Sequence, residues 1–536
     1  MVRLALGGGE METPKIVLTA DKTLMSNYNG SLFLGFAACS PVFIPHFLFQ
    51  KIFSPPVPKE KGRAKFASCG IRKVEAALLR NGFDRSEVMV VRPQDVKKRL
   101  SRETRVLGIT TNDPLGLGPA SSTFSDLLGK ETYSATSFRE LVLGVQPLVR
   151  RYGIKVLVGG PGAWQLEDKK IMQKYGIDSI CVGEGEITGV EMIRKAVDGE
   201  ELEPVNYGEV VPVEEIPSIV NPTVNGLVEI ARGCGRGCRF CNPTLLNYRC
   251  IPINNILEEV KVNVNTGIGV CLHAEDVLRY GVSGVVPDED KVLCLFREVL
   301  SLVGEPSKVG ISHFAFSSVV SKPGLIEKLS EMLEAGSKGN PWIAGQVGIE
   351  TGSPRLAEKH MVGKAKPFEA RRWPEIVLEA HKILKENNWV PCSTIVSGLP
   401  GEKAEDIIKS IELVEELKEY KSLVVPLFFV PIGALKREKF FSHKKMLPEH
   451  WQLLACCMKH NFRWIYKLED EYAASIGRLK KFLIKKVIKL MEKKLREPLK
   501  MMEQGLNPIS QKHPTTYHDK TKKAVSDNRE KLTLFS

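Results

Sequence analysis

The chain of 536 residues lacks a long uninterrupted hydrophobic run. Its strongest candidate for a membrane span, residues 31–49, is marginal in length and is interrupted by Pro41, Pro45 and His46. We expect a buried or ligand-facing loop there. The N-terminus also lacks the basic flank, apolar run and small-residue cleavage site of a signal peptide. We therefore expect no membrane span.

A regular cysteine framework is also absent, although the chain has twelve cysteines. Most stand singly in apolar surroundings, as Cys181, Cys271, Cys294 and Cys392 do. Reduced intracellular thiols usually sit in this way, whereas a disulfide framework shows regular spacing. The pattern favours a reducing compartment, so we expect a cytoplasmic protein.

Aromatic residues make up only 7% of the chain, and its net charge of +13 is concentrated late. Residues 477–500 carry ten basic and two acidic side chains, with apolar residues at helical spacing. This pattern predicts a basic amphipathic helix. Either the helix packs its apolar stripe on the protein and exposes its basic face to solvent, or it docks on an acidic protein partner, with a membrane surface or nucleic acid as lesser alternatives. Because stacking side chains are not interleaved with the basic ones, we expect no nucleic-acid partner.

The first part of the chain, from residue 15 to about 199, alternates short β-rich runs with helical stretches. This alternation predicts a parallel sheet covered by helices on both faces, which is a doubly wound, Rossmann-like domain over residues 1–215. Ligands bind such sheets at the loops that follow the strand carboxyl ends. Three of these loops have unusual sequences, at residues 111–122, 159–163 and 183–186.

A second alternating series follows a linker that is rich in proline and acidic residues, at residues 211–226. Its six strand–helix units, within residues 216–435, fit a partial, open β/α barrel. Residues 436–505 are predicted to be helical and basic, and residues 506–536 are polar enough to be disordered. The fold class is therefore α/β with a helical C-terminal region.

The stretch "ARGCGRGCRFC" places Cys234, Cys238 and Cys241 on one loop after the first predicted barrel strand, with no fourth cysteine close by. A structural zinc site needs four ligands, and a 4Fe-4S cluster has four metal corners. Three cysteines leave one corner open for a substrate or cofactor. The alternatives are a zinc site completed by Cys250 or a distant histidine, and unligated buried thiols.

Glycines alternate with these cysteines in the same loop. They let the backbone wrap tightly and direct N–H groups toward the sulfur atoms, which favours a negatively charged cluster. The residues concerned are Gly233, Gly235 and Gly237.

The C-x3-C-x2-C pattern with an aromatic residue before the third cysteine resembles the radical S-adenosylmethionine (SAM) enzymes. The resemblance extends over residues 226–433. It implies that the three cysteines hold a 4Fe-4S cluster whose fourth iron chelates the amino and carboxylate groups of SAM. It also implies that Phe240 lies against the adenine or the cluster.

Three further motifs resemble SAM-binding segments of that family. "HAEDV" offers Glu275 and Asp276 for the SAM ammonium, with the choice between them open and the family's frequent Gly-Gly-Glu form absent. "GIETGS" places Glu350 and Ser353 at the ribose, and "IVSGLPGE" places Gly398 at the adenine. Simpler readings also exist, with Asp276 as a helix N-cap and "SGLPGE" as a turn that starts a helix.

The first domain, joined in this order, resembles the cobalamin-binding domain of the cobalamin-dependent radical SAM subfamily. The resemblance implies close approach of two glycine-rich loops to that cofactor, through Gly159, Gly160, Gly162, Gly183, Glu184 and Gly185. The usual lower axial histidine is missing from the loop "TNDPLGLG", so Asn112, Asp113 or Leu115 approaches the lower face, or it stays empty. The alternative is a domain of similar fold that binds no cofactor and serves as a scaffold.

The resemblance implies a class B radical SAM methyltransferase with a 4Fe-4S cluster, SAM and cobalamin as cofactors. Its expected reaction is methylation of an unactivated sp3 carbon, with an electron donor as one partner. The basic late region favours a protein substrate with an acidic surface, and resemblance to archaeal members extends this expectation to a glutamine of methyl-coenzyme M reductase. His313 either lines the cavity or is a buried structural residue. The alternatives are a cobalamin-dependent cyclase, hydroxylase or epimerase, and a zinc-containing scaffold or nucleic-acid-binding protein.

Overall fold

The computed structural model describes residues 13–30, 35–472, 478–509, 522 and 525. The chain divides into two compact units: unit 1 holds Met1–Ala38, Phe43–Leu115 and Tyr133–Val224, and unit 2 holds Cys39–Val42, Gly116–Thr132 and Asn225–Ser536. In this division residues 116–132 lie with the second unit and residues 216–224 with the first, whereas the sequence analysis divides the chain after residue 215. Residues 436–505 also lie in unit 2 instead of forming a unit of their own.

A six-stranded parallel sheet forms the centre of unit 1, in the order β4-β1-β5-β6-β7-β8. The strands are β1 (Ile16–Ala20), β4 (Val88–Val90), β5 (Val106–Thr110), β6 (Lys155–Gly159), β7 (Ser179–Val182) and β8 (Val205–Tyr207). The chain passes from β1 to one side and then returns to the other side of β1 as β5. The order therefore reverses between these two strands, and such a switch point is where doubly wound sheets bind ligands.

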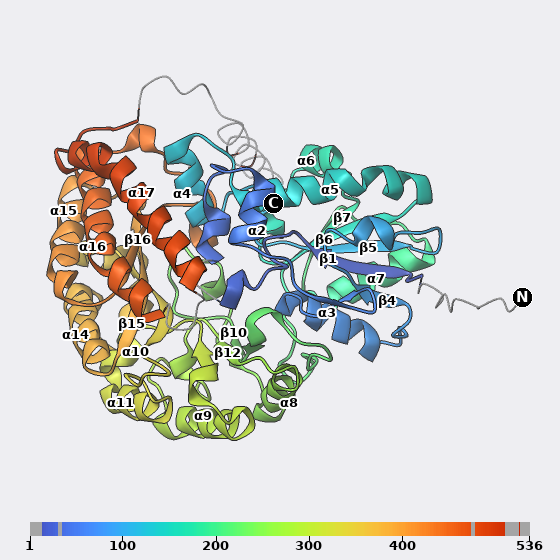
Figure 1. The fold of residues 1–536 in the computed structure, drawn as a ribbon, viewed down its shortest axis with the longest axis horizontal. Helices are drawn as coiled ribbons and strands as arrows, with labels where there is room; N and C mark the ends of the chain where they lie inside the picture. The colour runs from blue at the N-terminus through green and yellow to red at the C-terminus, as the bar shows by residue number, and fades with distance from the viewer. Residues whose placement is uncertain (1–12, 31–34, 473–477, 510–521, 523–524, 526–536) are drawn as a thin grey trace, which may run out of the picture. The chain divides into compact units, whose positions relative to one another are not determined.

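Helices cover both faces of this sheet (Figure 1). They are α2 (His46–Ile52), α3 (Cys69–Arg80), α5 (Tyr133–Tyr152), α6 (Lys169–Tyr175) and α7 (Thr188–Asp198), and a short hairpin is formed by β2 (Lys59–Glu60) and β3 (Arg63–Ala64). Apolar side chains of α3 and α7, such as Leu78 and Ile193, pack with Leu18, Val90 and Leu157 of the strands. The predicted α/β class with a parallel sheet is confirmed, because continuous apolar runs such as "IVLTA" are buried on both sides.

Six parallel strands of unit 2 follow one another in chain order. They are β9 (Leu227–Glu229), β12 (Val270–His273), β13 (Val309–Ile311), β14 (Ile343–Glu350), β15 (Trp389–Ser397) and β16 (Leu423–Phe428). The first three and the last three each form a sheet, and a parallel bridge between His313 and Gln346 joins β13 to β14. This order is the one expected of a partial β/α barrel, which stays a prediction.

Helices lie between successive strands of unit 2, and Figure 1 shows α8, α9, α11, α14 and α15 following one another around the outside. The helices of this part are α8 (Ile253–Val264), α9 (Glu289–Val303), α10 (Phe316–Ser321), α11 (Pro323–Met332), α12 (Pro354–His360), α13 (Val362–Ala365), α14 (Trp373–Glu386) and α15 (Ala404–Glu416). A hairpin of β10 (Ala231–Arg232) and β11 (Arg249–Cys250) encloses the cysteine loop. The loops that carry the predicted site residues follow the carboxyl ends of these strands.

Two helices complete unit 2, α16 (Pro448–Tyr472) and α17 (Arg478–Glu503). The amide of Asn461 on α16 accepts a hydrogen bond from the N–H of Val424 (2.7 Å) and donates one to its carbonyl (2.8 Å). These two bonds satisfy backbone groups at the edge of strand β16, which could otherwise pair with another chain. The predicted basic helix is α17, and Met502 near its end packs with Trp451 of α16.

The segment 116–132 forms α4 (Pro119–Leu128) and is held in unit 2 by two of its polar side chains. Thr123 Oγ1 accepts a hydrogen bond from the N–H of Phe428 (2.7 Å), and Asp126 accepts one from the N–H of His443 (2.7 Å). Burial opposes the charge on Asp126, but the side chain and N–H of His443 and the ammonium of Lys522 (3.3 Å) hold the pKa of its carboxyl below the ordinary value. Apart from residues 506–509, 522 and 525, the predicted disordered tail lies outside the described residues.

Within the described part of the chain, no helix is both long and apolar enough to cross a membrane. The predicted loop at residues 31–49 is described from residue 35 onward, where it contains a 3-10 turn (Phe36–Cys39) and α2.

Candidate functional site

The cysteine loop begins directly after β9 and β10, at the carboxyl end of the first strand of unit 2. Its glycines have left-handed backbones, with φ of +74° at Gly233, +67° at Gly235 and +76° at Gly237. A Cβ on Gly233 would overlap the backbone carbonyl of Asn247, on the returning side of the hairpin. The loop therefore needs glycine there both for its turn and for close packing.

Two other segments of unit 2 clamp this loop from outside the hairpin. The N–H of Arg239 donates to the carbonyl of His360 (2.9 Å), and the N–H of Leu435 donates to the carbonyl of Arg239 (3.1 Å). Glycine allows the closest approach at both places: a Cβ on Gly363 would overlap the Arg236 carbonyl, and one on Gly433 would stand 2.6 Å from the Cys241 carbonyl. The loop conformation is thus fixed by residues more than a hundred positions away.

The three thiols are removed from solvent to different degrees, and burial raises the pKa of each above its ordinary value, to about 11 for Cys238. Within the described part of the chain, no three His, Cys, Asp or Glu side chains are grouped to hold one metal ion. A 4Fe-4S cluster places each cysteine on a different iron, so its ligands need not converge on one point. The three-cysteine donor set on one glycine-rich loop fits such a cluster.

Cys250, the predicted alternative fourth ligand, lies opposite Ala231 on the hairpin. Its Sγ accepts a hydrogen bond from the N–H of Gly281 (3.1 Å). The contact gives this thiol a structural role on β11.

Asp276 is buried and bound entirely within the protein. Its carboxylate accepts hydrogen bonds from Arg236 Nη2 (2.9 Å), Ser318 Oγ (2.7 Å) and the N–H of Ala315 (3.3 Å). Arg236 belongs to the cysteine loop and is itself 5% exposed. Asp276 therefore anchors that loop to the β12 and β13 ends, and it makes no side-chain cap to the turn that follows it.

Glu275, its neighbour in sequence, has a different environment. No hydrogen bond to its carboxylate occurs among the described residues, and burial raises its pKa although His273 and Lys364 act in the opposite direction. Glu275 in turn contributes to the raised pKa of Cys241, after burial of that thiol. The carboxylate of Glu275 thus lies near the cysteine loop and is available to a ligand there.

Glu350 ends strand β14 with a left-handed backbone (φ +64°) and forms a largely buried ion pair with Lys364 Nζ. Its second carboxylate oxygen accepts a hydrogen bond from Thr394 Oγ1 (3.2 Å) on β15. Burial opposes the charge on Lys364, but Glu350 and Cys238 raise the pKa of its ammonium overall. A positive charge therefore lies beside the cysteine loop, at a residue that the sequence analysis missed.

Ser353 caps α12 by accepting a hydrogen bond from the N–H of Leu356 (3.2 Å). It also donates to Asp406 (2.6 Å), a residue that forms an ion pair with Arg355. The hydroxyl is 2% exposed and engaged on both sides, so the observed role of Ser353 is to fix the turn after Glu350.

Phe240 and Gly398 meet through a shared apolar cluster. Phe240 and Phe441 pack against Leu399 and Phe429, and a Cβ on Gly398 (φ +86°) would overlap the ring of Phe441. The N–H of Gly398 donates to Glu402 (2.6 Å), which begins the turn toward α15. The structure thus brings two predicted adenine contacts to one apolar surface, with Phe441 as a further member.

The glycine-rich loops of unit 1 each pack closely against another loop of the same unit. A Cβ on Gly160 (φ +96°) would stand 2.5 Å from Thr110 Oγ1, and one on Gly162 would overlap the carbonyl of Asn112. Gly183 approaches Gly208 in the same way (3.1 Å), and Glu184 accepts a hydrogen bond from the N–H of Val211 (2.9 Å). These glycines are required by the packing of the protein itself, whereas Gly159 and Gly185 have ordinary room for a Cβ.

The loop after β5 combines an exposed residue, Asn112, with two held ones. Asp113 accepts a hydrogen bond from Gln165 Nε2 (2.8 Å), and Gln165 Oε1 accepts one from the N–H of the buried Leu115 (2.9 Å). Asp21 follows β1 and is buried close to Asp113. Burial is the main cause that raises the pKa of its carboxyl. The sequence analysis missed Asp21, although its place after a buried strand could have signalled it.

Replacing Gly162 by valine is expected to lower the free energy of unfolding by about 1–3 kcal/mol, because the side chain must displace the backbone at Asn112. Urea unfolding of the whole chain measures this change. The matched control is Gly185→Ala, since its nearest neighbour, Val74, is 3.6 Å away. Equal stability of Gly162→Val and the parent chain would contradict the tight loop contact.

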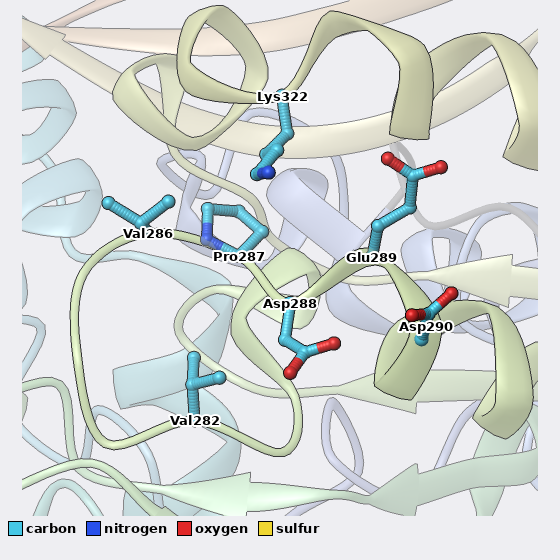
Figure 2. Close-up of a pocket in the computed structure, with 7 residues that line it drawn as sticks. All are labelled: Val282, Val286, Pro287, Asp288, Glu289, Asp290 and Lys322. Carbon is cyan, nitrogen blue, oxygen red and sulfur yellow. The ribbon is translucent and has the colours of Figure 1, made fainter.

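Figure 2 shows a hollow of about 620 Å³ beside the start of α9, away from the cysteine loop in sequence. It is lined by Val282, Val286, Pro287, Asp288, Glu289, Asp290 and Lys322. None of the predicted site residues is among them, and Asp288 already caps α9 by accepting a hydrogen bond from the N–H of Lys291 (3.2 Å). This hollow is not part of the candidate site.

Comparison with known proteins assigns part of unit 2. Residues 228–414 match the family model described as the Radical SAM superfamily, so this region is a radical SAM domain. An uncharacterized protein of Methanocaldococcus jannaschii is 26% identical over 54% of this chain and 66% of its own length. The ribosomal protein uS12 methylthiotransferase of Leptospira biflexa is 28% identical over 37% of this chain and 41% of its own. The chain thus spans less than two thirds of each of these relatives.

A solved structure is also similar, that of the radical S-adenosylmethionine methyltransferase TsrM from Kitasatospora setae. It is 13% identical, with a TM-score of 0.49, and the match covers 77% of this chain and 73% of that one. The match of residues 228–414 to the family model, and not this structural similarity, confirms the predicted radical SAM resemblance at the level of the domain. The cobalamin site and the individual residue roles stay predictions.

Proposed function

We propose that this protein is a cobalamin-dependent radical SAM C-methyltransferase that methylates an unactivated sp3 carbon. The observation that carries the proposal is the loop of Cys234, Cys238 and Cys241, with Glu275 and the Lys364–Glu350 pair close to its thiols, within a radical SAM domain. When bound, a 4Fe-4S cluster supplies the electron that cleaves SAM, and cobalamin carries the methyl group to be transferred.

The charges around the loop suit the amino acid end of SAM. Glu275 has a carboxylate without a hydrogen-bond partner among the described residues and can accept the SAM ammonium. Lys364 can donate to the SAM carboxylate while it keeps its contact with Glu350. Phe240 and Phe441 offer an apolar surface for the adenine. These side chains would hold SAM with its sulfonium next to the open iron, which is the positioning that such a reaction requires.

The proposed cobalamin site is the switch point of unit 1, at the carboxyl ends of β1 and β5. The strand order β4-β1-β5-β6-β7-β8 supports a ligand there. No histidine occurs in the loop after β5, so the exposed Asn112 is the side chain of that loop best placed to face a bound corrin.

We propose a protein residue as the substrate, on a partner with an acidic surface. Five basic side chains of α17 are exposed and have no ion pair among the described residues: Lys486, Lys489, Lys493, Lys494 and Arg496. They surround the exposed Leu490, which suits a protein surface better than a phosphate chain. A glutamine of methyl-coenzyme M reductase is the specific target that the sequence resemblance suggests.

Cofactor analysis of the full chain, purified without oxygen, tests the proposal. Iron, sulfide, zinc and cobalt are measured per chain, followed by the mass of products made with CD3-labelled SAM. About four irons per chain, together with cobalt, and a product heavier by one CD3 group are expected. Iron without cobalt would refute cobalamin dependence, whereas a product without CD3 would favour a cyclase, hydroxylase or epimerase. Zinc alone would overturn the radical assignment.

The two neighbouring acids are expected to respond differently to loss of charge. Glu275→Gln should weaken SAM binding about tenfold and leave stability nearly unchanged, because its carboxylate has no protein hydrogen bond among the described residues. Asp276→Asn should instead destabilise the chain by about 3 kcal/mol, because Arg236 loses its buried partner. Isothermal titration with SAM and urea unfolding separate the two effects. The reverse pattern would assign the SAM ammonium to Asp276.

A further inference from the structure

Polar side chains at or just after four adjacent strands of unit 2 lie next to one another across the strands. Strand pairing places Glu229 of β9 beside His273 of β12. Ser312 directly follows the last residue of β13 and lies beside His273, with its Oγ 2.9 Å from His273 Nδ1. The N–H of Gln346 on β14 donates to the carbonyl of Ser312 (2.7 Å). Glu229, His273, Ser312 and Gln346 therefore form one continuous row, here named the polar row.

The polar row faces away from the helices that surround the strands. The preceding residues of the first three strands, Val228, Leu272 and Ile311, are 0%, 0% and 1% exposed, because they are covered by the helices. Side chains alternate between the two faces of a strand, so the members of the row point to the opposite, inner side. They are only half-buried there, and the inner side therefore has room next to them.

The carboxylate of the polar row, that of Glu229, is paired within the protein. Arg232 holds Glu229 through two hydrogen bonds of 2.9 Å, from Nε and from Nη2. The ring of His313 lies 5.7 Å from that of His273, and burial lowers the pKa of His313 to about 4. His313 Nδ1 is buried and has no hydrogen-bond partner among the described residues. The inner side thus offers hydrogen-bond donors and acceptors, and its carboxylate is already held by Arg232.

The row is also close to the proposed SAM site. His273 is two residues before Glu275, and its charge is one of the causes that act on the pKa of Glu275. Glu275 in turn acts on Cys241. A group bound along the row would therefore lie next to the place where SAM is cleaved.

We propose that the polar row binds an uncharged hydrogen-bonding group of the substrate, such as an amide, and so holds the reacting carbon beside SAM. The inference rests on the proposed function and adds the chemical class of the substrate. His273 Nδ1 already pairs with Ser312. A hydrocarbon chain along the row would nevertheless remove its half-exposed polar groups from water without replacing the lost hydrogen bonds, which costs binding free energy for each group. The row therefore selects against lipid chains and also against strongly charged groups.

Deuterium transfer to 5′-deoxyadenosine tests this selection without knowledge of the product. The reduced, cluster-loaded full chain is given SAM and one of two fractions of an extract from cells of the source organism grown in deuterated medium. One fraction holds lipids soluble in organic solvent, and the other holds polar molecules and proteins. Mass spectrometry measures total and deuterated 5′-deoxyadenosine. The variants are Gln346→Met, His273→Leu and His273→Asn.

Deuterium is expected from the polar fraction only, with about tenfold less transfer by Gln346→Met and His273→Leu. His273→Asn should recover most of the transfer, because asparagine keeps a polar group near Ser312. Total 5′-deoxyadenosine should change less than about twofold, since SAM does not contact the row in this assignment. Loss of total cleavage in the variants would make the row part of the SAM site instead.

Other outcomes separate this inference from the proposed function. Deuterium from the lipid fraction, deuterium from neither fraction, or equal transfer by the leucine and asparagine variants would overturn the role of the row. Absence of 5′-deoxyadenosine from the parent chain would overturn radical SAM chemistry itself and the inference with it. Deuterium transfer without a methylated product would refute methyl transfer, while the polar row would stand.

Discussion

Replacing Cys234, Cys238 or Cys241 by alanine is expected to abolish cluster assembly and to lower SAM cleavage by about a thousandfold or more. Each cysteine would be the protein's sole ligand to one iron, and the open corner is reserved for SAM. The nearby carboxylate of Glu275 is not expected to substitute, because soft thiolate ligands suit iron–sulfur clusters better than carboxylates. Iron and sulfide content, and 5′-deoxyadenosine formed with a chemical reductant, measure the two losses.

Cys250→Ala is the matched control for these three variants. Its thiol lies on the same hairpin and accepts a hydrogen bond from the N–H of Gly281. We expect normal iron content, a slight loss of stability and nearly normal SAM cleavage. Retained activity in any of the three loop variants would refute the cluster ligands. Loss of metal from Cys250→Ala, with zinc as the metal of the parent chain, would establish the four-cysteine alternative.

Much of the fold follows from local sequence patterns. The apolar runs that predicted strands, such as "KVLVGG" and "CSTIVS", form β6 and β15. Parallel strands buried on both faces must be apolar along their length, so such runs stand out against the amphipathic helices between them. The parallel α/β class was therefore readable without the structure.

The place of residues 116–132 was not readable in this way. Their helical pattern predicts α4, but its partner depends on contacts of very long range, such as Thr123 with Phe428 and Asp126 with His443. A buried threonine and an aspartate carry no local signal of the unit in which they are bound. Sequence order alone assigned them to the first domain.

The candidate site shows the same division between local and distant information. The spacing of the cysteines located the loop, but the adjacent acids Glu275 and Asp276 are indistinguishable by sequence. Only the position of Arg236 shows that Asp276 is already paired. Lys364 lies in a stretch without a known motif, and only the fold brings it to Glu350.

Lys364→Met is expected to impair both stability and SAM binding, for two separable reasons. The substitution leaves the carboxylate of Glu350 buried without its partner, which should cost about 3–5 kcal/mol of unfolding free energy. It also removes the positive charge that we propose for the SAM carboxylate, which should weaken SAM binding about tenfold or more. Urea unfolding and titration with SAM measure these effects. Lys359→Met is the control, because among the described residues this exposed lysine donates only to the Pro400 carbonyl (3.0 Å).

A second variant decides whether Lys364 acts on SAM or only on the fold. Combining Lys364→Met with Glu350→Gln removes both charges, so no unpaired carboxylate stays buried and most of the lost stability should return. SAM binding should stay weak in the double variant, because the positive charge beside the cysteine loop is still missing. Recovery of SAM affinity together with stability would instead make the ion pair purely structural, and the SAM carboxylate would then need another partner.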